Sequence, residues 1–223
     1  MRMNLFYYLL LSILIIGFAA AEEVDMKPGS VNVKGISFQK YAGMAKIDYS
    51  RAAEIALEKN PGIILEIELE NEDGYLIYGV ELATQTGNVI ELMVDAGNGE
   101  ILGREIEDDG EENGDVDDEA GEKDDDEEEE SEKGSIKVGK HMNILEAAQM
   151  ARITAVEAAR KAIAREKGDF LAVELEKDDG VLLYEVILYN GGKNITEIEV
   201  DAGSGDVLEV ENEKYDENGE DED

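Results

Sequence analysis

Two aspartates occupy the same place in two copies of one short motif, and they are the residues of this chain best placed to do chemistry. Asp95 lies in the sequence Val-Asp-Ala-Gly at residues 94–97, and Asp201 lies in the same sequence at residues 200–203. A carboxylate at the start of a glycine-rich turn can bind a cation or a partner, but it more often accepts hydrogen bonds from its own turn amides. We expect structural turn aspartates and keep partner or metal binding as the alternative.

Other residue types limit the chemistry that these 223 residues can carry. The absence of cysteine excludes disulfides, thiolate metal sites and thiol nucleophiles. The single histidine, His141, excludes a metal centre with several histidine ligands. With 56 Asp and Glu residues, pairs of carboxylates arise by composition alone and are no sign of a hydrolase. We therefore predict that the protein is not an enzyme.

One acidic segment approaches a calcium-binding loop. Residues 109–120 place Gly114 at the sixth position of an EF-hand loop, but Glu111 stands where Asp or Asn is usual and Ala120 replaces the bidentate Glu. No apolar helices flank the segment. We expect no cofactor and only weak, non-specific Ca²⁺ binding by acidic runs such as residues 124–130.

The charge and the N-terminal segment indicate a compartment. A formal net charge of -36 argues against a nucleic-acid partner. Residues 5–21 are apolar and end in Ala19-Ala20-Ala21, which fits a signal-peptidase site, yet the run is also long enough to span a membrane. We predict that residues 1–21 are a signal peptide or an N-terminal anchor. The remaining chain is expected to be extracytoplasmic, either secreted or attached to the membrane through this segment alone.

The chain contains one unit twice. A shift of 106 positions superposes residues 47–102 on residues 153–208 without a gap. We predict two domains, at residues 36–104 and 140–208. The acidic residues 105–135 between them, and the acidic residues 209–223 after them, hold too few apolar side chains for a core and are predicted to be a disordered linker and tail.

Each unit begins with a predicted helix. Asp48 and Thr154 stand at N-cap positions, and Glu157 lies three residues after Thr154, as in a capping box. Small apolar residues, mostly alanine, then recur at helical spacing. A second helix is predicted just before, over residues 38–46 and 144–152.

After the helix the apolar period changes to two. Apolar residues at positions 65, 67 and 69 alternate with Glu66, Glu68 and Glu70, which is typical of a strand with one buried face. Asp-Gly pairs at residues 73–74 and 179–180 predict hairpin turns. The predicted fold class is α+β, with two small repeated domains that each pack one or two helices on an antiparallel meander of three or four strands.

Two tyrosines and the strand glutamates have both structural and binding interpretations. Tyr78 and Tyr184 fall on the inward face and are predicted to be core aromatics, with ligand contact as the alternative. The glutamate face, including Glu174 and Glu176, is expected to be solvated, with a cationic partner as the alternative.

The motifs together resemble a known family. An Ala- and Glu-rich helix, a strand, Asp-Gly, Tyr-x-Val-x-Leu and a closing Val-Asp-Ala-x-x-Gly-x-Ile-Leu resemble the PepSY domain, in both halves of the chain. PepSY domains are extracytoplasmic modules without an established catalytic centre, found in propeptides of thermolysin-like metalloproteases and in free-standing secreted or membrane-attached proteins.

The resemblance implies a non-catalytic binding or regulatory protein that modulates or inhibits a protease in trans. The alternative is an acidic cell-surface protein that binds divalent cations or cationic partners diffusely. The protein partner itself is unknown.

One further motif predicts a modification. Asn194-Ile195-Thr196 is an acceptor sequence for N-glycosylation in an exported chain, so we predict Asn194 as the candidate modified residue, with chance occurrence of the motif as the alternative.

Overall fold

The structure is a computed structural model that describes residues 26–107, 134–139, 141–192 and 194–214. The predicted signal peptide or anchor, the EF-hand-like segment, most of the predicted linker and the end of the predicted tail lie outside these residues. In the part of the chain that is described, no helix is both long enough and apolar enough to cross a membrane.

The first unit contains three helical segments and four strands. They are η2 (Phe38–Lys40), α2 (Tyr41–Met44), α3 (Tyr49–Lys59), β1 (Gly62–Glu72), β2 (Tyr75–Thr84), β3 (Val89–Asp95) and β4 (Ile101–Glu107). The second unit repeats the pattern with α4 (Ile144–Ala148), α5 (Ala155–Arg165), β5 (Asp169–Asp178), β6 (Val181–Gly191), β7 (Asn194–Asp201) and β8 (Val207–Lys214). The predicted helix and four-stranded meander are present in each unit, and the second helices are only one turn long.

One predicted boundary is wrong. We placed residues 209–223 in a disordered tail, but β8 continues to Lys214 and pairs with β7 along its length. Glu209 and Glu211 flank Val210 and lie opposite Glu199 and Glu197 of β7, so a sequence that is rich in charge is nevertheless a regular strand. The predicted linker likewise loses its first residues to β4, which ends at Glu107.

The predicted caps and turns are present. The Asp48 side chain accepts a hydrogen bond from the Arg51 amide at 2.8 Å. The Glu157 carboxylate accepts from the Thr154 amide at 2.8 Å while the Glu157 amide donates to the Thr154 hydroxyl, which completes the capping box. The Asp-Gly turns have positive φ angles at both residues, 51° and 88° in the first unit and 44° and 75° in the second. Such angles match the type I′ geometry that joins tightly paired strands.

The two meanders form one sheet, which the sequence did not predict. The strand order is β4-β3-β2-β1-β5-β6-β7-β8, and all neighbours are antiparallel. The halves join where β1 pairs with β5 through Glu66 with Glu174, Ile67 with Val173, and Glu68 with Ala172. Two separate domains were expected because sequence alternation identifies strands but not their partners across 100 residues. The α+β description holds, although the eight-stranded sheet dominates the molecule.

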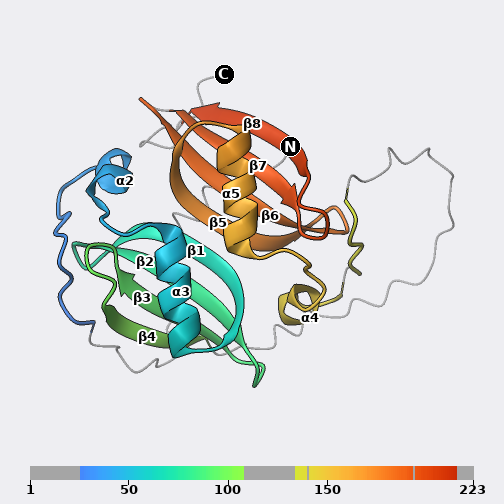
Figure 1. The fold of residues 1–223 in the computed structure, drawn as a ribbon, viewed down its shortest axis with the longest axis horizontal. Coiled ribbons are helices and arrows are strands. Elements are labelled where there is room, and N and C mark those ends of the chain that lie inside the picture. Colours follow the sequence, from blue (N-terminus) through green and yellow to red (C-terminus); the bar gives the residue numbers. More distant parts are fainter. Residues whose placement is uncertain (1–25, 108–133, 140, 193, 215–223) are drawn as a thin grey trace, which may run out of the picture.

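Both long helices cover the same face of the sheet (Figure 1). Fully buried alanines, among them Ala52, Ala56, Ala158 and Ala162, let the helices lie close to the strands. One hydrophobic core runs through both units. Tyr49 stacks on Phe170 with ring centroids 4.3 Å apart, so the two units also contact each other on the helix side.

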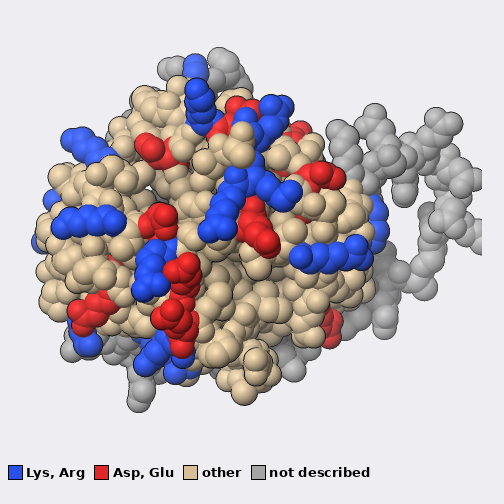
Figure 2. All heavy atoms as spheres, in the orientation of Figure 1, with Lys and Arg blue, Asp and Glu red and all other residues tan. Residues whose placement is uncertain are grey.

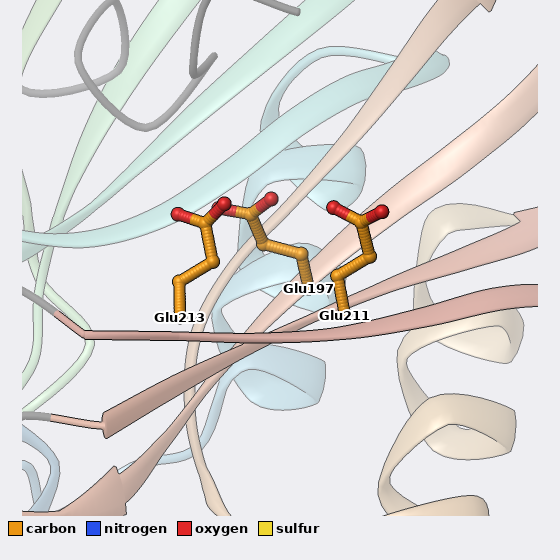
Figure 3. Close-up of side chains that lie close together, drawn as sticks. All are labelled: Glu197, Glu211 and Glu213. Atoms are coloured by element: carbon orange, nitrogen blue, oxygen red, sulfur yellow. The ribbon is translucent and has the colours of Figure 1, made fainter. Parts of the chain in front are cut away.

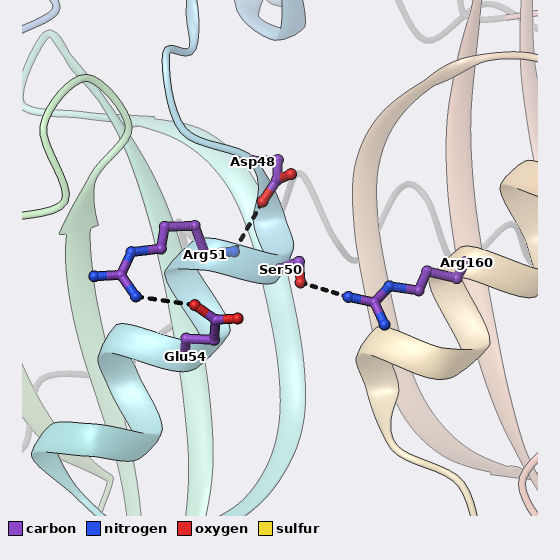
Figure 4. Close-up of polar contacts among 5 residues, drawn as sticks. All are labelled: Asp48, Ser50, Arg51, Glu54 and Arg160. Atoms are coloured by element: carbon purple, nitrogen blue, oxygen red, sulfur yellow. Dashed lines mark hydrogen bonds and ion pairs between the residues drawn. The ribbon is translucent and has the colours of Figure 1, made fainter.

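A polar contact joins the two helices as well. The Arg160 guanidinium of α5 donates to the Ser50 hydroxyl of α3 at 2.9 Å, while Arg51 pairs with Glu54 within α3 (Figure 4). Lys and Arg side chains lie among the acidic ones over this helix-covered face (Figure 2).

Candidate functional site

The face of the sheet opposite the helices carries a continuous line of glutamates. Each strand contributes one residue that lies directly opposite the glutamate of the next strand. In spatial order these are Glu105, Glu91, Glu81, Glu66, Glu174, Glu185, Glu199 and Glu209. We call this set the glutamate row. Six of its members are half-buried, Glu209 is exposed and Glu185 is buried.

Further glutamates flank the row on the same face. Glu68 and Glu70 follow Glu66 along β1, and Glu176 follows Glu174 along β5. Near Glu70 the backbone of Gly79 leaves room for carboxylates, because a Cβ at this residue would lie 2.6 Å from Oε1 of Glu70 and 2.7 Å from Oε1 of Glu91. The face is therefore dense in carboxyl groups.

Crowding and burial change the protonation of these groups. Like charges directly opposite on neighbouring strands repel each other, and removal of a carboxylate from water disfavours its charged form. Burial first, and then the charges of neighbouring glutamates, raise the pKa of Glu68 to about 8, of Glu176 to about 8 and of Glu185 to about 9. The pKa values of Glu66 and Glu70 are raised for the same reasons, and burial raises that of Glu174. Near neutral pH the row therefore holds protons that ordinary glutamates have released.

Glu185 is the most confined member of the row. Only 8% of this residue is exposed, so its carboxyl group is largely removed from water. Its pKa is raised by burial and then by Glu176, Glu197, Glu174 and Glu199. Both effects disfavour the charged form of the carboxyl group. A positive group placed beside it would favour that form.

A pocket opens beside the middle of the row, where β1 and β5 separate beyond their three paired residues. It has a volume of about 260 Å³, and its lining includes four glutamates and one lysine, Lys177. Glu66, Glu81, Glu174 and Glu176 are the glutamates. The junction between the two units is thus both acidic and hollow.

The predicted site aspartates lie away from this face, in the two closing turns. Oδ1 of Asp95 accepts from the Ser30 hydroxyl at 2.6 Å and from the amides of Gly97 and Asn98 at 2.6 and 3.0 Å, and Oδ2 accepts from the Ser30 amide. Asp201 makes the same four contacts with Ser135, Gly203 and Ser204. These aspartates tie the segment that precedes each unit to its last turn.

Hydrogen bonds outweigh burial at both aspartates. Burial at 1% exposure would raise the pKa of Asp201, but donation by the Ser135 hydroxyl and by three amides lowers it to about 2. The pKa of Asp95 is lowered in the same way by Ser30, Gly97 and Asn98. With all these donors satisfied inside the protein, neither carboxylate is presented to a ligand.

The predicted tyrosines are part of the core. The Tyr78 hydroxyl donates to the carbonyl of Ile47 at 3.2 Å, and the Tyr184 hydroxyl donates to the carbonyl of Ile153 at 3.1 Å. Both rings are buried, and burial raises the pKa of each hydroxyl. They hold the chain just before the long helix, which leaves their hydroxyls occupied.

The predicted glycosylation site stays a prediction. Asn194 is exposed at the start of β7, and its side chain donates to the carbonyl of Gly191 at 3.3 Å. Thr196 of the same motif is buried and donates to Asn212 at 2.7 Å. His141, which we assigned no role, is exposed.

The glutamate row was not predicted from the sequence. Acidic faces on β1 and β5 were expected, but the row requires the register of every hairpin together with the pairing of β1 with β5. The available signal was that the sequence of every strand contains at least one Glu, including Glu209, which the sequence alone assigned to the tail.

Comparisons with known proteins give one sequence match and one structural match. The chain is 36% identical over 67 residues to YkoJ of Bacillus subtilis (strain 168), an uncharacterised protein; the match covers 30% of this chain and 39% of YkoJ. The chain therefore spans well under half of that relative. A crystal structure of a protein of Clostridium difficile 630, described as a "putative lipoprotein", matches with a TM-score of 0.42 and 23% identity over 76% of this chain and 95% of the other.

A family model agrees with the repeat. The model described as "Peptidase propeptide and YPEB domain", PepSY, matches residues 46–105 and again residues 152–211. These ranges contain the long helix and the first three strands of each unit, and most of the fourth. Since the two matches together cover more than half of the chain, the protein belongs to the PepSY family and carries its domain twice.

Proposed function

We propose that this protein is a non-catalytic, extracytoplasmic binding protein whose acidic sheet face docks a cationic segment of a protein partner. The glutamate row is the observation that carries the proposal. Neighbouring strands lie about 4.8 Å apart, so eight strands present carboxyl groups along about 34 Å. That length suits an extended basic segment or a basic ridge on a folded partner, either of which would contact both units at once.

Electrostatics favours such a partner over a neutral one. A lysine or arginine placed among the row carboxylates relieves their mutual repulsion and favours the charged form of the buried Glu185 carboxyl group. Binding would also release protons from glutamates whose pKa is raised, so affinity is expected to increase with pH. Complementary charge mainly accelerates association and selects the partner.

A secreted protease is the partner that we propose. The family description names peptidase propeptides, which bind proteases, and the N-terminal segment predicts export. A free-standing protein of this kind would act on the protease in trans. Diffuse cation binding by the acidic chain as a whole is the competing explanation.

A pair of variants with three Glu→Gln changes each separates the two explanations. The row variant E66Q/E174Q/E185Q removes three carboxylates from the centre of the sheet, and the control E54Q/E58Q/E146Q removes three from exposed helical positions. Binding of a fluorescent oligolysine to the full chain is measured by anisotropy at increasing salt. We expect the row variant to lose at least about tenfold in affinity while the control changes little. Equal losses in both variants would support diffuse binding instead.

The protease is tested in a separate assay. A secreted thermolysin-like metalloprotease is mixed with the wild-type chain and with each variant, and cleavage of a small substrate is followed. The proposal expects wild type and the control to alter the rate and the row variant to do so less. An unchanged rate in every case would exclude this protease class as the partner. It would not bear on the docking of cationic segments, which the oligolysine measurement tests.

A further inference from the structure

Three carboxylates converge at the outer edge of the second unit. Glu197 of β7 lies directly opposite Glu211 of β8, and Glu213 follows two residues later on the same face. One oxygen from each of the three lies within 4.8 Å of the others. Among the described residues, no other group of three acidic or histidine side chains comes together in this way. We call these residues the edge triad.

One oxygen of the edge triad lacks the partner that its burial requires. Oε1 of Glu197 is buried and accepts no hydrogen bond from any described residue. The carboxyl groups of Glu197 and Glu213 turn toward one another, with that of Glu211 beside them (Figure 3). Buried acceptors in proteins are almost always satisfied, so this oxygen calls for a donor or a cation. Two further carboxylates at this distance favour the cation.

We propose that Glu197, Glu211 and Glu213 form a specific divalent-cation site that binds Ca²⁺. Three carboxylates supply up to six oxygen ligands, which suits the six to eight that Ca²⁺ takes in flexible geometry. Zn²⁺ prefers nitrogen and sulfur ligands, and Mg²⁺ demands near-octahedral geometry and keeps several of its waters. The site goes beyond the proposed docking function, since none of its residues belongs to the glutamate row.

The electrostatics of the edge triad agree with this assignment. Burial first, and then the charges of Glu213, Glu211 and Glu199, raise the pKa of Glu197 to about 7. A cation among these groups would replace the proton and remove the repulsion. The bound ion would contact side chains of both β7 and β8, so it would also hold β8, the last strand, to the sheet.

The experiment must separate one specific site from binding by the remaining acidic residues. Thermal melts of the full chain are recorded at pH 8 in 150 mM KCl, with a chelator or with increasing CaCl₂, so that the salt screens diffuse binding. Wild type is expected to melt several degrees higher with calcium and to reach a plateau, since a ligand that binds only the folded state stabilises it. The variant E197Q/E211Q/E213Q is expected to melt in chelator at or above the wild-type temperature and to lose the calcium shift.

Controls make each outcome decisive. The variant E54Q/E58Q/E146Q has the same change in charge and should keep the calcium shift, as should the row variant E66Q/E174Q/E185Q. The single change Glu211→Gln, at an exposed position where folding is not at risk, should raise the calcium concentration at half-saturation about tenfold or more. A wild type without a saturable shift, or an edge-triad variant that keeps the shift, would overturn the site.

Discussion

The two units share their fold but differ on the face that the helices leave uncovered. Gly79 of β2 becomes Glu185 of β6 under the shift of 106 residues. In the first unit, two carboxylates approach the bare backbone of Gly79. In the second unit, the corresponding carboxylates have another glutamate between them, and the pKa of Glu185 rises to about 9.

Several residues that are identical in the two units hold the fold together. Asp95 and Asp201 anchor the segment before each unit, and Tyr78 and Tyr184 hold the start of each long helix. Helix caps and Asp-Gly turns recur as well. The uncovered face makes none of these contacts, so it could change in one unit without loss of the fold.

The pairing of β1 with β5 aligns the glutamates of the two uncovered faces into one continuous row. Ile67 and Val173 are equivalent residues and lie opposite each other, so the sheet has a pseudo-twofold axis at this pair. Glu66 pairs with Glu174, whose equivalent in the first unit is Glu68 and not Glu66. The row therefore runs through non-equivalent positions of the two units. The line of residues related to it by this axis holds only three glutamates, Glu68, Glu197 and Glu211, and its other positions include Gly79, Met93 and Ala172.

Among the changes that we predict, separation of the two units is expected to lower stability most. Fragments 26–107 and 134–214 would each lose the pairing of β1 with β5 and expose core residues such as Tyr49 or Phe170. We expect the full chain to unfold in one transition, and each fragment to melt on the order of 10 °C lower or to form dimers through its free strand. Calorimetry and sedimentation measure both properties. Fragments as stable as the full chain would show that the shared sheet contributes little.

Replacement of the turn aspartates is expected to have the second-largest effect on stability. Asp201→Ala leaves the amides of Ser135, Gly203 and Ser204 without their acceptor, and Asp95→Ala does the same in the first unit. From sequence alone a loss of about 1 to 2 kcal/mol is expected for a local cap. Because each aspartate also fastens a segment 65 or 66 residues away, we now expect about 3 kcal/mol in each unit. Denaturant unfolding tests this, with the exposed Asp169→Ala as control.

The aspartates also make a distinct contribution to acid stability. A lowered pKa in the folded state stabilises the protein above the ordinary aspartate pKa, and this contribution is lost as the pH falls toward the folded value of about 2. Wild type should therefore lose stability between about pH 4 and pH 2 more steeply than Asp201→Asn. Parallel curves for the two proteins would contradict the hydrogen-bonded carboxylate.

The third prediction concerns Glu185 and has the opposite dependence on pH. A pKa that is raised in the folded state stabilises the protein below the ordinary glutamate pKa. This contribution to stability is lost as the pH rises toward the folded value of about 9. Glu185→Gln should match wild type near pH 4 and become more stable from about pH 5 upward, by on the order of 2 kcal/mol at pH 9. Chemical unfolding across this range provides the comparison, with Glu58→Gln as an exposed control. A constant difference at all pH values would mean that Glu185 is not titrating as described.

Local signals made part of this structure predictable from the sequence. The Thr154 and Glu157 capping box and the Asp73-Gly74 turn each need only neighbouring residues, and they appear where they were predicted. The joint between Ile67 and Val173 could not be predicted, because an alternating strand offers two edges and nothing nearby selects the partner. The candidate site depends on that joint and on the register of every hairpin, so it emerged only in three dimensions.

The smallest effect on stability is expected for a change at Gly79, the residue of the first unit that corresponds to Glu185. Gly79→Ala places a Cβ against the ends of the Glu70 and Glu91 side chains, which are flexible and can move. At pH 4 both carboxyl groups rearrange at little cost, and alanine in a strand should gain about 0.5 kcal/mol over glycine. At pH 9 the displaced carboxylates are forced toward other charges of the face, such as Glu68, and the same change should cost about 0.5 kcal/mol. Chemical unfolding at the two pH values measures this reversal of sign. If Gly79→Ala is equally favourable at both, the space above Gly79 does not accommodate charge, and the difference between Gly79 and Glu185 is one of size alone.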